Sequence, residues 1–271
     1  DFKATSKRKK INTFYQFERI LSRYEDVLIS YATEDVLNNT LVDVNNPRPI
    51  LLSARKTKPI YHFLNENIVF LQPTRIISRK QIEVGFEFIG KFVNQEILQY
   101  QFRNNDNLKI TLLITGPIAS GHYDYFKELL DKFNSLLDEL PVHIRDKVYL
   151  AFLFSELDKE DYQKRFTHPV GISDLYNISS LILLPSKTEG RGLPIIEAAA
   201  AGVPIFCNRY APLDVFNEVI GQHLPEKLRL RIFEYDGRHI NKQDVAAISK
   251  RIFFPHLFID EQQHNREVIQ F

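Results

Sequence analysis

The sequence predicts an α/β protein with a doubly wound parallel sheet. Short apolar runs of strand type recur along the chain, and stretches in which apolar residues have helical spacing separate them. Proline or glycine follows several of these runs and would end the strand there. Strands that read as continuous apolar runs are typical of a parallel sheet covered on both faces, and right-handed crossovers then give a doubly wound fold.

The predicted strands and helices alternate regularly from Asn67 onward. The strands are predicted at Ile68–Leu71, Ile110–Ile114, Val148–Phe154, Leu181–Leu184, Val203–Phe206 and Leu230–Phe233. The helices are predicted at Ile82–Phe92, Tyr125–Leu136, Asp174–Ile178, Pro194–Ala201, Leu213–Val219, Asp244–Arg251 and Glu261–Gln270. Ligands of such folds bind at the carboxyl ends of the strands, near the point where strand order reverses, so we expect the site there.

Residues 1–65 differ from the rest of the chain and are predicted to form a separate segment or linker. Apolar residues at helical spacing predict an amphipathic helix over residues 12–32, and Ile50–Leu52 has the composition of a short strand. The basic run Ser6–Lys10 is interpreted as a solvated end. The expected organisation is therefore this segment, a sheet domain over residues 66–240, and closing helices over residues 241–271.

Composition narrows the functional classes. The 271 residues are 44% hydrophobic and 25% charged, as in soluble globular proteins. A formal net charge of +1 favours neither nucleic acid nor an anionic membrane, so no nucleic-acid partner is expected. With Cys207 as the only cysteine, no intrachain disulfide can form, and together with the lack of a signal-peptide pattern this predicts a cytoplasmic location. The absence of any methionine indicates a fragment, a processed product or a sequence with altered residues.

A glycine-rich turn follows the predicted strand Leu181–Leu184 and leads into the helix at Pro194. A helix that begins at the carboxyl end of a parallel strand offers unpaired N–H groups and a positive dipole end, which suit a phosphate. Gly190 and Gly192 allow the backbone to approach a ligand closely. Pro194 suits the first helical position, where its missing N–H would be unpaired anyway.

Two carboxylates, Glu189 and Glu197, frame this turn. They would repel a phosphate that touched them, so they more plausibly meet hydroxyl groups, such as those of a ribose and a sugar. Glu197 is expected in the first helical turn, where a carboxylate is also favoured by the helix dipole alone. A phosphate site flanked by carboxylates that bind hydroxyls indicates a sugar nucleotide.

Three cations, Arg75, Arg79 and Lys80, follow the first core strand near a predicted helix start, where the dipole disfavours positive charge. Their charge could be offset by Glu83 and Glu87, one and two turns from Arg79. The functional alternative is a diphosphate held by Arg75 and Lys80. In the proposed sheet this loop lies at the same edge as the glycine-rich turn, which favours the second interpretation.

These segments resemble the carboxyl-terminal, donor-binding domain of retaining GT-B glycosyltransferases of the family 4 type. The matching residues are Leu183–Ser186, Glu189, Gly190, Gly192–Pro194, Glu197–Ala198, Gly202–Pro204, Gln72–Arg75, Lys80 and His264–Glu267. Two glutamates separated by seven residues are the signature of that family. The resemblance covers about residues 66–271 and implies a Rossmann-like GT-B half.

The resemblance also implies roles for individual residues. Arg75 and Lys80 would bind the donor diphosphate and stabilise the leaving group, Glu197 would bind the ribose hydroxyls, and Glu189 would contact the transferred sugar. The implied catalytic residues are Glu189, Arg75 and Lys80, and the implied donor-binding residues are Arg75, Lys80, Gly190, Arg191, Gly192, Leu193 and Glu197. The implied reaction is sugar transfer from a nucleotide diphosphate sugar with retained configuration, without a metal or other cofactor.

The sequence departs from the family in two respects. Arg191 stands where the family often has an aromatic residue, which changes the sugar pocket or suits an acidic donor or acceptor. Residues 1–65 are too few for the acceptor domain and would be its remnant. The acceptor is thus an unknown saccharide, lipid or protein, with peripheral membrane contact through a missing domain as one option, and the oligomeric state is not predicted. The alternatives are a non-catalytic GT-B-like interaction module and a sugar-nucleotide epimerase of the same fold.

Overall fold

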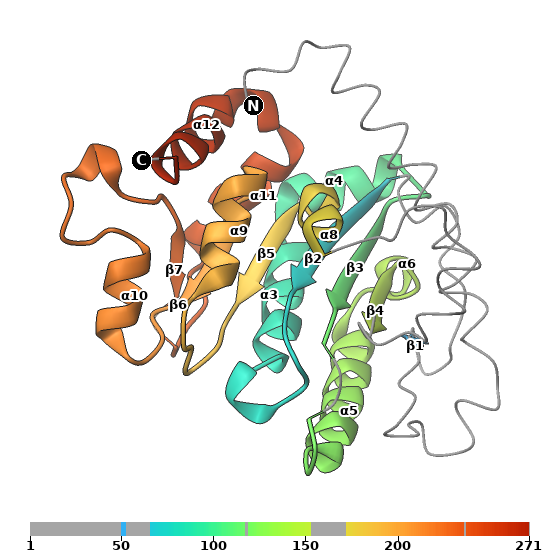
Figure 1. The fold of residues 1–271 in the computed structure, drawn as a ribbon. Coiled ribbons are helices and arrows are strands. Elements are labelled where there is room, and N and C mark those ends of the chain that lie inside the picture. The colour runs from blue at the N-terminus through green and yellow to red at the C-terminus, as the bar shows by residue number, and fades with distance from the viewer. Residues whose placement is uncertain (1–49, 53–65, 117–118, 153–171, 236, 271) are drawn as a thin grey trace, which may run out of the picture.

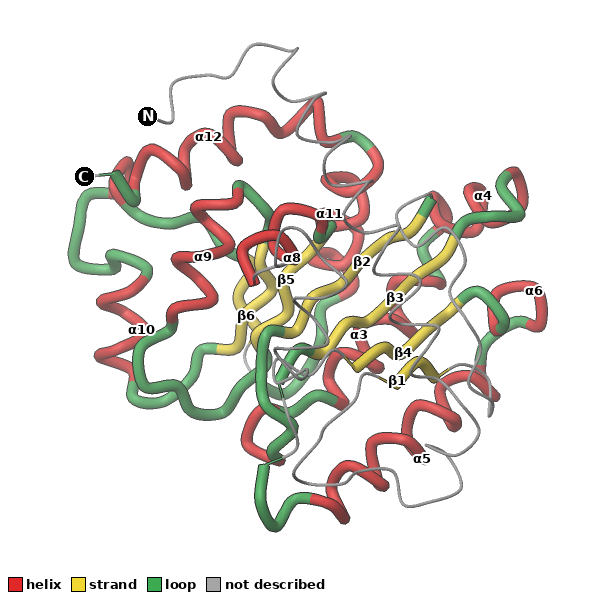
Figure 2. The backbone as a smooth tube through the Cα atoms, turned by 45° about the vertical axis from the view of Figure 1, so that its right-hand side comes forward, coloured by secondary structure: helices red, strands yellow, loops and turns green. Residues whose placement is uncertain are grey.

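A computed structural model describes residues 50–52, 66–116, 119–152, 172–235 and 237–270 (Figure 1). The predicted helix over residues 12–32 and the basic run Ser6–Lys10 lie outside the described residues. Within them, strands occupy the centre of the molecule and helices lie on both sides (Figure 2).

A seven-stranded sheet with the order β1-β4-β3-β2-β5-β6-β7 forms this centre. The strands are β1 (Ile50–Leu52), β2 (Asn67–Gln72), β3 (Lys109–Ile114), β4 (Val148–Phe152), β5 (Leu181–Leu184), β6 (Ile205–Asn208) and β7 (Phe233–Tyr235). Strands β2 to β7 pair in parallel, which confirms the predicted fold class. Strand β1 pairs antiparallel with β4 at the edge of the sheet.

The order of the strands reverses between β2 and β5. The chain runs outward from β2 through β3 to β4, and then returns to the centre to continue through β5, β6 and β7 on the other side. Strands β2 and β5 are direct neighbours, with Phe70 opposite Leu181 and Leu71 opposite Ile182. Since both strands run in the same direction, the loops that follow them leave the sheet side by side at the reversal point.

Helices cover both faces of the sheet. On one face lie α3 (Glu83–Val93), α4 (Glu96–Asn104), α5 (Tyr123–Glu139), α6 (Val142–Arg145) and α11 (Lys242–Phe253). On the other lie α8 (Ile172–Ile178), α9 (Leu193–Ala201), α10 (Leu213–Val219) and α12 (Ile259–Val268). Short 3-10 turns span Ser78–Lys80, Glu226–Leu228 and Pro255–Phe258.

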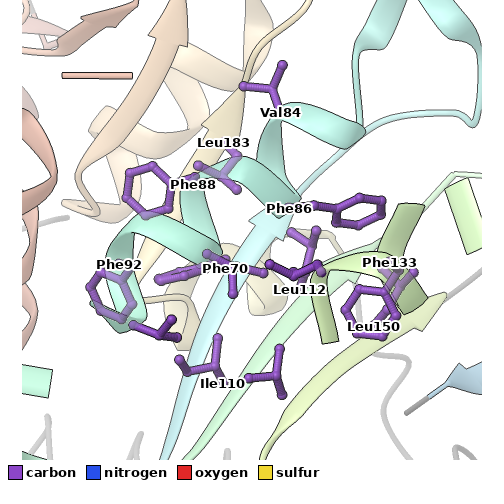
Figure 3. Close-up of a cluster of buried hydrophobic side chains, with 14 of the residues drawn as sticks. Phe70, Val84, Phe86, Phe88, Phe92, Ile110, Leu112, Phe133, Leu150 and Leu183 are labelled. Carbon is purple, nitrogen blue, oxygen red and sulfur yellow. The ribbon is translucent and has the colours of Figure 1, made fainter. Parts of the chain in front are cut away.

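Side chains of β2 alternate between the two cores. Phe70 points to the face of α3, where its ring meets Phe88 and Phe92 edge-on at centroid distances of 5.5 and 5.0 Å (Figure 3). Val69 and Leu71 point to the opposite face, among the side chains of α8 and α9. The continuous apolar run of this strand is therefore needed on both sides, as in other buried parallel strands.

Two strands begin later than the sequence predicts. Strand β6 begins at Ile205 and not at Val203, because the N–H of Val203 donates to the carbonyl of Ala198 and so caps α9. Gly202, in the left-handed region at φ 69°, makes this cap possible. The apolar pattern alone does not distinguish a residue in a cap from one in a strand.

The last strand, β7, also begins later than predicted because of hydrogen bonds made outside the sheet. The N–H of Leu230 donates to Ile220, and Arg231 exchanges both backbone hydrogen bonds with the side-chain amide of Asn265 on α12. These tertiary bonds keep both residues out of the sheet, so pairing with β6 starts only at Phe233. Helices α4 and α6 were not predicted from the sequence.

Candidate functional site

The loops that follow β2 and β5 are joined to each other by hydrogen bonds. The N–H of Lys187 donates to the carbonyl of Arg79 at 2.8 Å, and the Arg79 guanidinium donates to the carbonyl of Thr188 at 2.8 Å. Residues more than one hundred positions apart in the sequence thus form one structure at the reversal point of the sheet, where doubly wound folds bind ligands.

A buried ion pair spans these two loops. The Lys80 ammonium contacts the Glu189 carboxylate, and the two side chains are only 12% and 10% exposed. One basic and one acidic residue of the predicted site therefore lie together, and in this structure they neutralise each other. Because both charged groups are largely buried, each needs the other, or a ligand, to compensate for its lost hydration.

Lys80 reaches Glu189 from a 3-10 turn, Ser78–Lys80, that precedes α3. The carbonyl of Lys80 accepts a hydrogen bond from the side-chain amide of Gln72, the last residue of β2. Gln81 follows at φ 49° in the left-handed region and turns the chain into the helix. The turn is therefore anchored to the strand end, and the lysine side chain is directed toward the neighbouring loop.

The alternative explanation for the cations is wrong. Glu83 accepts a hydrogen bond from the Tyr125 hydroxyl at 2.6 Å, and Glu87 pairs with Lys91 at 3.2 Å. Neither carboxylate pairs with Arg79, whose guanidinium binds Thr188. The acidic side chains on α3 thus leave the charges of the preceding loop free for other partners.

Arg75 lies exposed in the same loop, and its guanidinium makes no hydrogen bond or ion pair to a described residue. Its backbone packs against Gly116, which follows β3. A Cβ atom at Gly116 would come within 2.6 Å of the Arg75 Cα, and the Gly116 N–H donates to the carbonyl of Thr74 at 2.8 Å. The backbone at Arg75 is therefore fixed while its side chain remains available.

The two glycines of the turn differ in their structural roles. Gly192 has φ 60°, and a Cβ atom added there would overlap the Tyr210 hydroxyl, so both conformation and space require glycine. A Cβ atom at Gly190 would meet nothing within 4 Å. Gly190 and Arg191 are exposed, as is Leu193, the first residue of α9. The turn therefore presents an open outer surface above a tightly packed base.

Helix α9 starts one residue earlier than predicted. Gly192 is its N-cap, and the N–H of Ile195 donates to the Gly192 carbonyl, so Leu193 is the first helical residue and Pro194 the second. The expectation that Glu197 lies in the first helical turn is wrong, since that turn contains no acidic residue. The helix dipole acts mainly within the first turn, so it gives a weaker account of a carboxylate at this position.

Two buried tyrosines lie beneath the site and were missed by the sequence analysis. Tyr176 on α8 and Tyr210 after β6 are 1% and 0% exposed, and neither hydroxyl meets hydrogen-bond geometry with a described group. Burial raises the pKa of Tyr176, and the neighbouring Glu197 and Glu189 carboxylates raise it further. Burial also raises the pKa of Tyr210, followed by the effects of Cys207 and Glu189. In the sequence both tyrosines resemble ordinary core residues, so no local signal identifies them as part of the site.

A pocket lies at the opposite edge of the sheet, beside the residues that precede β6 and the first residue of β7, and is lined in part by Arg251 and Glu261. These two side chains form a close ion pair at 2.7 Å, so the pocket offers no unpaired charge from them. Within the described ranges, no group of three or more His, Cys, Asp or Glu side chains is arranged to hold a metal ion. No helix there combines the length and apolar character that a membrane span needs.

Two curated relatives of the chain share one name. The chain is 30% identical over 202 residues to the mannosylglucosylglycerate synthase of Petrotoga mobilis, covering 72% of this chain and 44% of the relative. It is 26% identical over 226 residues to the enzyme of the same name from Thermotoga maritima, covering 78% of this chain and 48% of the relative. The chain thus spans about half the length of these relatives.

Solved structures share the fold at low identity. HepE from Anabaena in complex with UDP superposes with a TM-score of 0.51 at 14% identity, over 76% of this chain and 44% of that chain. The apo structure of OtsA gives a TM-score of 0.51 at 12% identity, over 78% of this chain and 41% of that chain. The family model described as "Glycosyl transferases group 1" matches residues 58–252, which is most of the chain. The chain therefore belongs to the glycosyl transferases group 1 family.

Proposed function

We propose that this chain is the donor-binding half of a glycosyltransferase that transfers a sugar from a nucleotide diphosphate sugar with retained anomeric configuration. The observation that carries the proposal is the contact between Lys80 and Glu189, which joins the basic loop after β2 to the acidic loop after β5. A crevice that combines cations with carboxylates suits a ligand that carries both phosphates and hydroxyls. A nucleotide sugar has both kinds of group, because rings that carry hydroxyls lie on either side of its diphosphate.

The cations are assigned to the diphosphate. Arg75 is exposed and unpaired among the described residues, so its planar guanidinium can take two phosphate oxygens. Lys80 supplies a compact charge, and a phosphate would replace Glu189 as its partner. As the bond to the sugar breaks, negative charge grows on the departing phosphate, and these two cations would stabilise it.

The carboxylates are assigned to the hydroxyls. Glu189, released from Lys80 by the phosphate, would accept hydrogen bonds from the transferred sugar. Glu197 would accept them from the ribose, and backbone N–H groups of the turn from Gly190 to Leu193 would contact sugar or phosphate. No residue is proposed as a catalytic base, because the charges above act by binding and stabilisation.

The similarity to known proteins also supports the proposed class of reaction. Two relatives are named as synthases of mannosylglucosylglycerate, a glycosylated product, and a neighbour with the same fold is solved with UDP. The proposal includes donor binding without a metal ion, since the cations of the protein would take the role that a divalent ion plays elsewhere.

Isothermal titration calorimetry with a panel of nucleotide sugars tests the proposal. We expect one of them to bind in the absence of Mg²⁺, and we expect Arg75→Ala and Glu197→Ala to weaken that binding strongly while circular dichroism shows an intact fold. Unchanged affinity in both folded variants would refute the site, and a strict Mg²⁺ requirement would refute the metal-free mode. Incubation of the bound donor with and without added acceptors, followed by NMR of the anomeric proton, separates transfer from epimerisation.

A further inference from the structure

The buried hydroxyl of Tyr176 has no structural use that the described residues reveal. The side chain extends from α8 into the core beneath α9 and is 1% exposed. Its hydroxyl oxygen is shielded from solvent and meets hydrogen-bond geometry with no described group. A buried polar group without a partner is disfavoured, and phenylalanine would fill the same space without one. The hydroxyl therefore requires an explanation.

Among the carboxylates, Glu197 has the largest effect on the pKa of this hydroxyl. It lies on α9, which packs against α8 (Figure 2), and the Glu189 carboxylate has a smaller effect on the pKa of the same hydroxyl. The structure gives Glu197 no ion pair to a described residue. The buried phenol remains protonated, as its raised pKa requires, and so it can only donate to a carboxylate.

We propose that Tyr176 is a positioning residue for the donor: when the nucleotide binds, its hydroxyl donates to one oxygen of Glu197 and aims that carboxylate at the ribose hydroxyls. The proposal rests on the proposed function, because it takes from it the role of Glu197. A glutamate side chain has several rotatable bonds, and holding it in one orientation costs entropy when the ligand arrives. A buried donor on the neighbouring helix can offset part of that cost with a new hydrogen bond as the carboxylate turns toward the ribose, while the remaining lone pairs of Glu197 stay free for the ribose.

The test compares a nucleotide with its form lacking ribose hydroxyls. The probe is whichever of UDP, GDP and ADP binds the 271-residue chain most tightly, together with its 2′,3′-dideoxy form. We expect Tyr176→Phe to weaken binding of the ribonucleotide about fivefold to tenfold, which corresponds to the net contribution of one typical hydrogen bond. It should leave binding of the dideoxy form unchanged, because Glu197 then has no hydroxyls to bind.

Two further variants make the result specific. Glu197→Gln should abolish the preference for the ribonucleotide. Tyr125→Phe removes a buried hydroxyl from the opposite face of the sheet, where it bonds to Ile82 and Glu83, and should change both affinities equally if at all. This control separates a general loss of packing from an effect that passes through Glu197.

The outcomes are distinguishable. Equal weakening of both nucleotides by Tyr176→Phe would overturn the inference and leave the proposed function standing. An unchanged preference in Glu197→Gln, or no binding of any nucleotide by the parent chain, would overturn the proposed function and the inference with it. If Tyr176→Phe does not fold, the parent chain labelled with ¹³C at Cζ of Tyr176 replaces it. Its resonance should then shift with the ribonucleotide and not with the dideoxy form, and no shift with either would also overturn the inference.

Discussion

Lys80 and Glu189 lie on loops that leave opposite halves of the sheet, and their charged groups are in direct contact. The pair is about nine-tenths buried, so neither charge is well compensated by water. One consequence is structural, because each residue helps to hold the two loops together. The other is functional, because a diphosphate can compete with Glu189 for the same ammonium.

Neutralising one member of this pair should destabilise the protein more than neutralising both. Lys80→Met or Glu189→Gln alone leaves one buried charge without its partner, which we expect to cost about 1–3 kcal/mol in the free energy of unfolding. The double variant removes both charges, and we expect a coupling free energy of at least about 1 kcal/mol in urea denaturation. Strictly additive single effects would show that the contact does not contribute to stability. Glu87→Gln, which breaks the exposed pair with Lys91, is the matched control and should have little effect.

The two glycines of the turn should respond differently to alanine. Gly192→Ala forces a left-handed residue to carry a Cβ atom that overlaps the Tyr210 hydroxyl, and we expect a loss of about 1–3 kcal/mol in thermal unfolding. Gly190→Ala meets open space and should change stability by less than about 0.5 kcal/mol. Adding Tyr210→Phe to Gly192→Ala removes the overlapping atom and should restore part of the loss. Equal effects at both glycines would contradict this account of the turn.

The sheet and its reversal point could be predicted because local patterns determine them. Strand β5 and helix α10 have the predicted boundaries. The apolar character of Val203 and Leu230 predicts that both belong to strands, and the structure differs at both. Hydrogen bonds to Ala198 and Ile220, which no pattern encodes, hold them outside the sheet.

The site could be predicted in part. That the loops after β2 and β5 lie together follows from strand order, and the structure brings Lys80 to Glu189 as part of that arrangement. The partner of each side chain could not be predicted, because contact between residues 109 positions apart depends on the exact path of both loops. The sequence equally could not identify Tyr176, whose surroundings distinguish it from a core residue only once α8 and α9 are packed.

Arg75 should matter for the ligand and not for the fold. Its guanidinium is exposed and unpaired among the described residues, so Arg75→Ala should leave the melting temperature within about 1 °C, the usual range of a surface substitution. Calorimetry should show a large loss of affinity for the donor, and the affinity of the parent should fall with added salt. Arg103→Ala, an exposed arginine on α4, is the control and should change neither property. A destabilised Arg75→Ala would show that the arginine has a structural partner instead.

Alkaline pH should destabilise the protein through its buried acids. Burial, and then Glu189 and Glu234, raise the pKa of the Cys207 thiol well above its ordinary value of 9.0. In the unfolded chain this thiol loses its proton near that ordinary value, whereas in the folded chain it keeps it. The unfolded state therefore binds fewer protons above about pH 9, and the free energy of unfolding should fall there by up to about 1.4 kcal/mol per pH unit for this group.

Cys207→Ala isolates this contribution. The variant loses some packing at every pH, so the informative quantity is the slope of stability against pH and not its absolute value. Between about pH 9 and 10 the free energy of unfolding should fall less steeply with pH than in the parent, by an amount that corresponds to at most one bound proton. Below about pH 8 the two slopes should agree. The buried tyrosines, whose ordinary pKa is 10.0, add their own loss at higher pH in both proteins. The same burial should make Cys207 unreactive toward thiol reagents until the protein unfolds, so rapid labelling of the folded chain at pH 8 would contradict both expectations together.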